Sequence, residues 1–453
     1  MNLYHFFLLF LNFINFISSQ FIFEIKREIK EPTEDNYLDY ITNNRITTEI
    51  KIGEPPQTII ASIDLYQHAF YISPIEKGGT YNYKLSKTYS NQTGEEYYYS
   101  KQCLRQGYHG NESFIFKTID DEDKKLKDIN FIMGENRNIE YCFKLLNAQI
   151  GLTYIKYSKL FDSNYITYLN HKEILKSYAF FFQFANNSNE KDYLIIGGYP
   201  HEFDSDNYDN KNLIKGYIEN DNFWNIIMIM QVDGNSSKIE SYCKLDILMK
   251  GIQSSYIYQR IIDEMFFNKY FDSKLCFKNQ SKDIFQGLLY YTCDLSIDIQ
   301  KFPNLFFKFE SMNYTFNLTY NDLFIKFNNK YYFLIVFHRK ISRDWILGEI
   351  FIKKYNLIFD QNIESVSLYT NFTSHKKKKD KDHGDKKNEN EGNKSLLKIL
   401  VLIFFLSTVI LSILLYKFIL RFPRKKRANE LDDSFDYQTK ENIQKTDYTK
   451  LIN

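Results

Sequence analysis

The sequence predicts a mostly β protein whose body, residues 21 to 370, is divided into two β lobes. Short runs of β-branched and aromatic residues dominate this body, and Gly, Pro, Asn and Asp separate them, which is the pattern of strands and turns. Only Lys172 to Tyr178 and Tyr258 to Phe266 have a helical pattern. A body of about 350 residues is too long for one sandwich, so we expect two lobes.

The composition argues against nucleic acid as a partner. The 453 residues include 58 Lys and Arg against 56 Asp and Glu, a formal net charge of +2. This balance creates no long-range field that would gather phosphates, and no basic stripe interleaved with aromatics crosses the central region. With 44% hydrophobic residues the chain can bury a core, which excludes wholesale disorder.

The first segment has the form of a secretory signal peptide, which we place at residues 1 to 19. Residues 3 to 17 are almost entirely apolar, and the small residues Ser18 and Ser19 follow, as expected of a signal-peptide core and its cleavage site. No Lys or Arg precedes the apolar run, which leaves an uncleaved anchor as the alternative. In both cases the chain enters the secretory pathway.

The C-terminal part predicts a single membrane span at residues 396 to 420. Residues 399 to 416 are 18 uncharged residues, and at about 1.5 Å per residue the span crosses a bilayer core of roughly 30 Å. A basic cluster follows at 421 to 427, which keeps the tail, 421 to 453, in the cytosol. The body would therefore be lumenal or extracellular, as in a type I protein. A buried core helix is the alternative, which the basic flank and the length of the helix disfavour.

A charged segment, residues 374 to 395, connects the body to the span. It holds Lys, Asp, Glu and Asn and almost no apolar residue, so we expect a solvated stalk. Its lysine run could alternatively bind anionic lipid or polysaccharide.

Two sets of residues agree with an exported body. Glycosylation sequons precede the predicted span and none follows it; they begin at Asn91, Asn111, Asn186, Asn235, Asn279, Asn313, Asn317, Asn371 and Asn393. All five cysteines also lie before the span, where disulfides persist. We expect the pairs Cys276 with Cys293 and Cys103 with Cys142, which leaves Cys243 unpaired.

Five segments of the body follow one another in a telling order. Glu49 to Ile72, EIKIGEPPQTIIASIDLYQHAFYI, comes first and contains Asp64, while Asp344 to Asp360, DWILGEIFIKKYNLIFD, extends over 17 positions. Between these two lie Gln149 to Leu152, Phe180 to Pro200 and Phe223 with Trp224. Together they resemble the pepsin-like aspartic proteases.

This resemblance implies the two-lobed pepsin-like acid protease fold. The N-terminal lobe would span 21 to 200, including its bridging strands, and the C-terminal lobe 201 to 370. It further implies a monomer that binds a peptide or protein in a cleft and needs no cofactor. In the family, one carboxylate from each lobe shares a proton: the ionised one activates a water while the other donates to the scissile carbonyl.

The resemblance identifies Asp64 as the first catalytic carboxylate. The family follows this Asp with Thr, Gly and Ser, whereas this chain has Leu65, Tyr66 and Gln67. If Tyr66 stands where only glycine fits, either the turn rearranges or the aromatic ring fills the centre of the dyad.

The second carboxylate is harder to find in the sequence. Aligning Gln253 to Tyr256 with Gln67 to Phe70 puts Lys250 at the matching position, or Gly251 after a shift of one residue. Asp246 is the nearest carboxylate, but on this alignment it requires a slip of four residues. Lys250 opposite the first aspartate would form an ion pair and leave no shared proton.

Other candidate site residues are few. Tyr108, before His109 and Gly110, is the local match to the tip of the family's flap hairpin. His68 could touch the cleft or pack within its lobe. The eight histidines are scattered singly without Cys or acidic residues at ligand spacing, so we expect no metal site.

Two functions are compatible with these residues. The inspected motifs favour a membrane-anchored family member with impaired or lost catalysis that binds peptides or partners in its cleft. The alternative is an active aspartic endopeptidase of the secretory or endolysosomal system. The tail segment Tyr448 to Leu451 has the Tyr-x-x-hydrophobic form that endocytic adaptors bind, which would take the protein to an acidic compartment.

Overall fold

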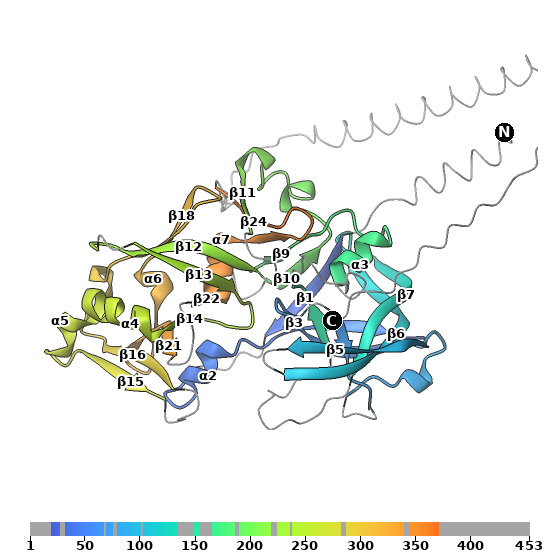
Figure 1. Ribbon diagram of the computed structural model, residues 1–453, viewed down its shortest axis with the longest axis horizontal. Helices are drawn as coiled ribbons and strands as arrows, with labels where there is room; N and C mark the ends of the chain where they lie inside the picture. The colour runs from blue at the N-terminus through green and yellow to red at the C-terminus, as the bar shows by residue number, and fades with distance from the viewer. Residues whose placement is uncertain are drawn as a thin grey trace, which may run out of the picture. The chain divides into compact units, whose positions relative to one another are not determined.

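The computed structural model describes the body of the chain (Figure 1). The described residues are 20–27, 32–67, 69–75, 79–100, 103–134, 148–153, 165–185, 190–218, 224–235, 238–281, 287–338 and 344–370. They all belong to the first of two compact units, Met1–His375. The expected signal peptide, stalk, membrane span and tail lie outside the described residues. Within the described part, no helix is long and apolar enough to cross a membrane.

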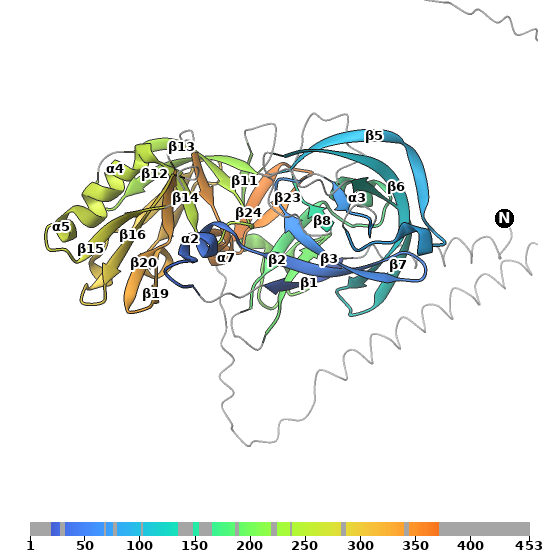
Figure 2. The ribbon, with the colours of Figure 1, turned by 90° about the horizontal axis from the view of Figure 1, so that it is seen from below.

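The described strands form two sheets (Figure 2). The first sheet has 13 described strands: β1 (Phe21–Arg27), β2 (Ile46–Ile52), β3 (Gln57–Asp64), β4 (Phe70–Ile72), β5 (Ser90–Ser100), β6 (Cys103–Thr118), β7 (Asp123–Gly134), β8 (Ala148–Gly151), β9 (Ala179–Gln183), β10 (Asp192–Ile196), β11 (Leu213–Tyr217), β23 (Ile358–Asp360) and β24 (Ser365–Tyr369).

The second sheet lies in the other lobe. Its 11 described strands are β12 (Asn225–Val232), β13 (Ile239–Leu245), β14 (Ile252–Ser255), β15 (Cys276–Gln280), β16 (Leu288–Asp294), β17 (Leu305–Phe309), β18 (Tyr314–Leu318), β19 (Phe324–Phe327), β20 (Lys330–Phe333), β21 (Ile335–His338) and β22 (Asp344–Leu347).

Helices in the described residues are short. They are α2 (Tyr37–Thr42), α3 (Tyr165–His171), α4 (Tyr256–Ile262), α5 (Asn268–Phe271), α6 (Tyr320–Leu323), α7 (Glu349–Tyr355), the π-helical η6 (Asp263–Phe267), and the 3-10 turns η2 (Tyr83–Leu85), η4 (Pro200–Glu202), η5 (Asn210–Asn212) and η7 (Ile299–Lys301).

Side-chain alternation explains why these segments form half-buried strands. In β12 every second residue is buried, as a period of two on a one-sided sheet requires. β3 begins with this alternation but ends in four buried residues, Ala61 to Asp64. The last four residues of β3 are therefore covered on both faces of the sheet, which removes the terminal aspartate from bulk water.

Six strands from distant parts of the chain connect the lobes. β1 pairs with β10, β10 with β9, β9 with β23, β23 with β24, and β24 with β11. Above this junction the ring of Phe180 stacks on Phe359 at 5.0 Å, and Trp224 packs edge-on against both. The Trp224 indole also donates a hydrogen bond to the Leu152 carbonyl at 2.8 Å. The core is thus continuous between the lobes.

The two lobes exchange segments across residue 200. Strands β11, β23 and β24 come from the C-terminal part but join the first sheet. Helix α2 comes from the N-terminal part but packs beside β14 of the second lobe (Figures 1 and 2). Its Tyr37 is fully buried among the rings of Tyr290, Phe327 and Tyr332.

The structure confirms one of the two expected helices. Tyr258 to Phe266 lies within α4 and η6. The helix expected at Lys172 to Tyr178 is wrong, because α3 ends at His171 and Glu173 adopts a left-handed φ of 56°. A side chain in that region cannot continue a right-handed helix.

Candidate active site

The first aspartate ends strand β3. Asp64 is fully buried, and its Oδ1 accepts a hydrogen bond from the backbone N–H of Tyr66 at 2.7 Å. Its backbone carbonyl accepts a hydrogen bond from Leu152 at 2.9 Å. An aspartate that accepts from the N–H two residues later closes a tight local turn. The carboxylate is therefore held in one orientation by its own backbone.

The second lobe repeats this turn at Asp246. This residue directly follows β13 and is 7% exposed. Its Oδ1 accepts a hydrogen bond from the backbone N–H of Leu248 at 2.9 Å. The donor again comes from the residue two positions after the aspartate, so the two turns have the same hydrogen bond.

The strands around the two aspartates also pair in the same way. β3 runs parallel to β8, where Asp64 lies opposite Gly151. β13 runs parallel to β22 in a register that brings Asp246, its next residue, beside Gly348. A third strand, β4 or β14, then pairs antiparallel and starts six positions after each aspartate. Asp64 and Asp246 thus occupy equivalent positions.

The paired glycines show how close the two chains are in each copy. A Cβ on Gly151 would lie 2.5 Å from the carbonyl oxygen of Gln67, and one on Gly348 would lie 2.3 Å from that of Met249. Gln67 and Met249 each follow their aspartate by three positions. No side chain fits at either glycine, so each glycine fixes the register of its turn.

The expectation that Lys250 or Gly251 matches the first aspartate is therefore wrong. In the observed register Asp246 holds that place and needs no slip, while Lys250 matches His68, which itself lies outside the described residues. Gln67 to Phe70 and Gln253 to Tyr256 share a glutamine and an aromatic residue three positions later only by chance. The sequence does contain a signal for this register. A glycine, Gly348, directly precedes α7, and the aspartate that lies beside this glycine directly follows an aliphatic residue.

The family model described as eukaryotic aspartyl protease matches residues 46–370. The chain belongs to this family. No curated protein matches the chain. The matched range contains both aspartates and nearly all of both sheets. The mostly β fold and the pepsin-like resemblance are thereby confirmed, and family membership implies that the protein binds a peptide or protein substrate.

Tyr66 brings a phenol to the two aspartates of this aspartyl protease domain. Burial raises the pKa of Tyr66 well above its usual range, and the negative charges of Asp246, Asp64 and Asp344 raise this pKa further. The phenol therefore stays protonated and can act only as a neutral hydrogen-bonding group. Carboxylates from both lobes therefore lie near enough to raise the pKa of this one side chain.

Tyr66 fits its turn without rearranging it. Left-handed φ angles, which would require a glycine, occur at other described residues such as Asn313 and Asn356, and Tyr66 is not among them. Its backbone N–H makes the turn's hydrogen bond. The expected conflict between this side chain and the turn is therefore absent.

The two turns lack the hydroxyl groups that the family has beside its aspartates. Leu65 and Ile247 follow the aspartates directly, and Gln67 and Met249 stand three positions after them; all four are buried. Neither polar atom of the Gln67 amide has a hydrogen-bond partner among the described residues. A hydrogen bond from a backbone N–H contributes to the orientation of each carboxylate.

Lys250 lies against α2, the helix from the N-terminal part of the chain that packs on the second lobe. Its Nζ is 4.3 Å from the centre of the Tyr40 ring, and its backbone N–H donates to the Ile41 carbonyl at 3.1 Å. A cation over an aromatic face is stabilised by the ring quadrupole. The lysine thus serves to hold α2.

Tyr108 is not at the tip of a hairpin. It lies within β6, paired with Glu95 on one side and Met133 on the other, and is 41% exposed. The β5–β6 hairpin closes where Ser100 pairs with Cys103. The expected flap tip at Tyr108 is therefore wrong by several residues, because the strands extend further than the local motif indicates.

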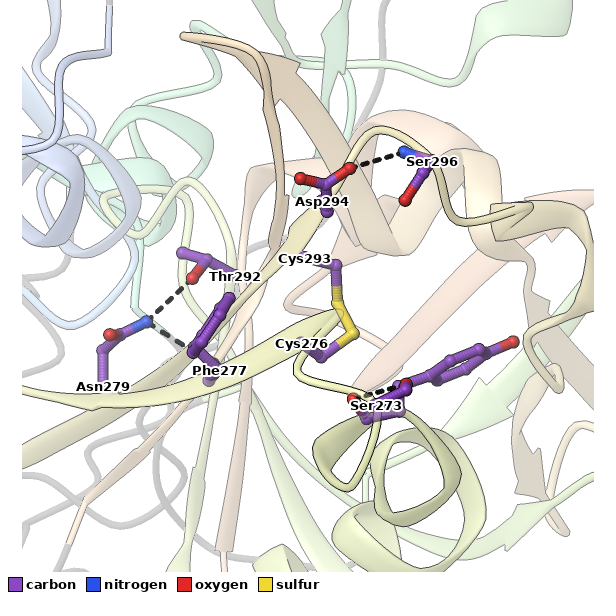
Figure 3. Close-up of a disulfide and its surroundings, with 9 residues drawn as sticks. Ser273, Cys276, Phe277, Asn279, Thr292, Cys293, Asp294 and Ser296 are labelled. Carbon is purple, nitrogen blue, oxygen red and sulfur yellow. Dashed lines mark hydrogen bonds between the residues drawn. A yellow bond between two sulfur atoms is a disulfide. The ribbon is translucent and has the colours of Figure 1, made fainter.

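The structure confirms one expected disulfide. Cys276 and Cys293 pair across the β15–β16 hairpin, with an S–S distance of 2.04 Å (Figure 3). Cys243 is a buried free cysteine, as expected. Cys142 lies outside the described residues, so the pair with Cys103 stays a prediction.

The sequon asparagines differ in their surroundings. Asn91 and Asn313 are exposed, whereas Asn111, Asn235, Asn279 and Asn317 are half-buried. Asn279 donates to the Thr292 hydroxyl at 3.0 Å (Figure 3). The sequons that lie outside the described residues are Asn186, Asn371 and Asn393. Within the described ranges, no group of three or more His, Cys, Asp or Glu could hold a metal ion.

Proposed function

We propose that the protein is an aspartic endopeptidase that uses Asp64 and Asp246 as its catalytic pair. The observation that supports this most directly is the equivalent placement of the two aspartates beside Gly151 and Gly348. Each carboxylate is buried and accepts a hydrogen bond from a backbone N–H. A pair of carboxylates, one from each lobe, is what acid proteolysis requires.

The chemistry would follow from two different protonation states. One carboxylate is ionised and takes a proton from a water as the water oxygen attacks the scissile carbonyl carbon. The other carboxylic acid donates its proton to the carbonyl oxygen. The first carboxylic acid, now protonated, gives its proton to the amide nitrogen as the C–N bond breaks, and a hydroxyl of the tetrahedral intermediate returns a proton to the second carboxylate, which restores the shared proton.

We further propose that turnover is slow. Hydroxyl groups normally help to hold each carboxylate, and this chain has Leu65 and Ile247 at the nearest of these positions. Each missing hydrogen bond to a charged group is worth about 1.5 to 3 kcal/mol. If that stabilisation acts in the transition state, each loss slows the reaction by about tenfold or more.

The second candidate is a peptide-binding protein without catalysis. It is favoured by the apolar residues beside both aspartates and by the Tyr66 phenol, which both carboxylates influence. In that case a peptide would bind between the lobes and leave uncut.

Turnover of a denatured protein at acid pH separates the two candidates. The purified full chain should cut it slowly, pepstatin should inhibit the cleavage, and Asp64→Asn should abolish it. If pepstatin-sensitive cleavage is undetectable while a peptide still binds the wild-type protein, the peptide-binding function holds instead.

For its location we propose a single-pass type I membrane protein with a lumenal or extracellular body. The apolar run at 399 to 416 and the basic cluster at 421 to 427 support this topology. A glycosidase that removes N-linked glycans should lower the apparent mass of the wild-type protein. This change in mass should vanish when the sequons before the span are removed. Protection of the tail from protease in sealed vesicles would contradict the topology.

A further inference from the structure

Asn44 joins the N-terminal segment to the turn that carries Asp246. It is 8% exposed and lies between α2 and β2. Its side-chain amide donates one hydrogen bond to the Ile247 carbonyl at 2.8 Å and another to Oε2 of Glu349. Its backbone N–H donates to the Leu248 carbonyl at 2.6 Å. The two residues that follow Asp246 are thus both held by this asparagine.

Glu349 is fixed from two further sides. It is the first residue of α7 and is 4% exposed, and its backbone N–H donates to the Met249 carbonyl at 2.7 Å. Its Oε1 accepts from the guanidinium of Arg27, whose Nε lies 2.6 Å from Oδ2 of Asp192. A buried carboxylate needs such partners, because an unpaired charge away from water is costly. Glu349 therefore offers the asparagine amide a rigid acceptor.

Leu248 is the residue through which this network reaches the aspartate. Its carbonyl accepts from the backbone of Asn44, and its N–H donates to Oδ1 of Asp246. Any tilt of Leu248 would move the N–H that orients the carboxylate. Ile247 and Met249 supply no side-chain hydroxyl. The orientation of the Asp246 carboxylate therefore depends more strongly on the Leu248 N–H than it would beside a hydroxyl group.

We propose that Asn44 is a positioning residue for Asp246, an inference that rests on the proposed peptidase function. The asparagine acts through the Ile247 and Leu248 carbonyls and touches no reacting atom. It fixes the turn on one side while Glu349 and Arg27 fix the asparagine. Misplacing a catalytic group by about 1 Å costs on the order of a hundredfold in rate.

The test compares Asn44→Ala and Asn44→Asp with Asn43→Ala in the full chain. Asn44→Asp has nearly the same shape but lacks the amide donors, so both variants at this position should behave alike. Their kcat should fall by about tenfold or more while KM changes by less than about threefold. The adjacent Asn43 donates from its side chain to Asp39 at 2.6 Å, which lies in its own segment, and the described residues show no other side-chain partner for it, so its variant should keep the wild-type kcat.

Amide hydrogen exchange at Leu248 gives a second measurement that needs no activity. Exchange of this N–H should speed up by about tenfold or more in Asn44→Ala and stay unchanged in Asn43→Ala, at equal global stability. An inactive wild-type protein with this exchange pattern would refute the peptidase function and leave the positioning of the turn supported. Unchanged kcat and unchanged exchange in Asn44→Ala would overturn the inference.

Discussion

Tyr66 stands two positions after Asp64, where the family has glycine, and its half-buried ring lies near both aspartates. We expect the ring to reduce the space for water and substrate at the proposed catalytic pair. Tyr66→Gly should therefore raise kcat/KM by about tenfold. Tyr66→Phe keeps the ring and should stay within about twofold of the wild type. Peptide turnover at acid pH measures both variants.

Loss of activity in both variants would show that the phenol takes part in the reaction. If Tyr66→Phe and Tyr66→Gly both lose activity, the protonated hydroxyl is a hydrogen-bond donor that the reaction needs. The pKa of Tyr66, raised by burial and by the neighbouring carboxylates, keeps that proton in place at the acid pH of the assay.

The sequence identifies the two aspartates unequally. Asp64 is evident because Gly53, Pro56 and Gln57 precede it at family spacing. Asp246 has no such run before it, and its register depends on Gly348, which lies about a hundred residues later and pairs with it only in the fold. Strand pairing over such a distance leaves no local pattern, so inspection of the neighbourhood alone could not fix the register.

Two sequons on one hairpin make a matched pair. Asn313 lies in the turn between β17 and β18, is exposed, and has a left-handed φ of 50°. Asn317 lies within β18, where its backbone N–H donates to the Tyr355 hydroxyl at 2.6 Å and its side-chain oxygen is buried. An oligosaccharide is bulky and needs an asparagine side chain at the surface.

We therefore expect a glycan on Asn313 and none on Asn317. Mass spectrometry of the protein from the secretory pathway should find the modification at the first site, and Asn313→Gln should remove it. Asn317→Gln should leave the glycan mass unchanged. A glycan on Asn317 would mean that β18 forms after the modification.

At the level of elements, the sequence predicts strands better than their partners. Alternation is visible in β12, and buried runs indicate β9 and β23. The placement of α2 in the second lobe has no sequence signal, because its burial depends on Tyr37 entering a cluster of rings from β16, β19 and β20. The β5–β6 hairpin likewise extends beyond the motif at Tyr108, because β5 and β6 stay paired up to Ser100 and Cys103.

His201 links the lobe junction to the last described strand and makes stability depend on pH. Its Nδ1 lies 2.5 Å from the hydroxyl of Tyr369 in β24. Burial lowers the pKa of His201 below its usual value of about 6.5. Above that pH both folded and unfolded chains hold a neutral ring; as the pH falls below it, the unfolded chain takes up the proton first.

This group's stability contribution is therefore present above about pH 6.5 and is lost as the pH falls through the lower folded pKa. Denaturant titrations of His201→Gln should show a smaller fall in the free energy of unfolding over that window. The exposed His171 provides the control substitution, His171→Gln. Equal slopes for all three proteins would contradict this account.

The whole molecule is built around a pair of lobes that each supply one aspartate, and substitution of the second one tests this most directly. Rates of pepstatin-sensitive cleavage should be measured for Asp246→Asn and Lys250→Met. The sequence alone offers both residues as candidates for the position that matches Asp64. We predict that Asp246→Asn lowers kcat by at least about a thousandfold and that Lys250→Met retains it within about threefold. Full activity in Asp246→Asn would show that this carboxylate is not the partner of Asp64.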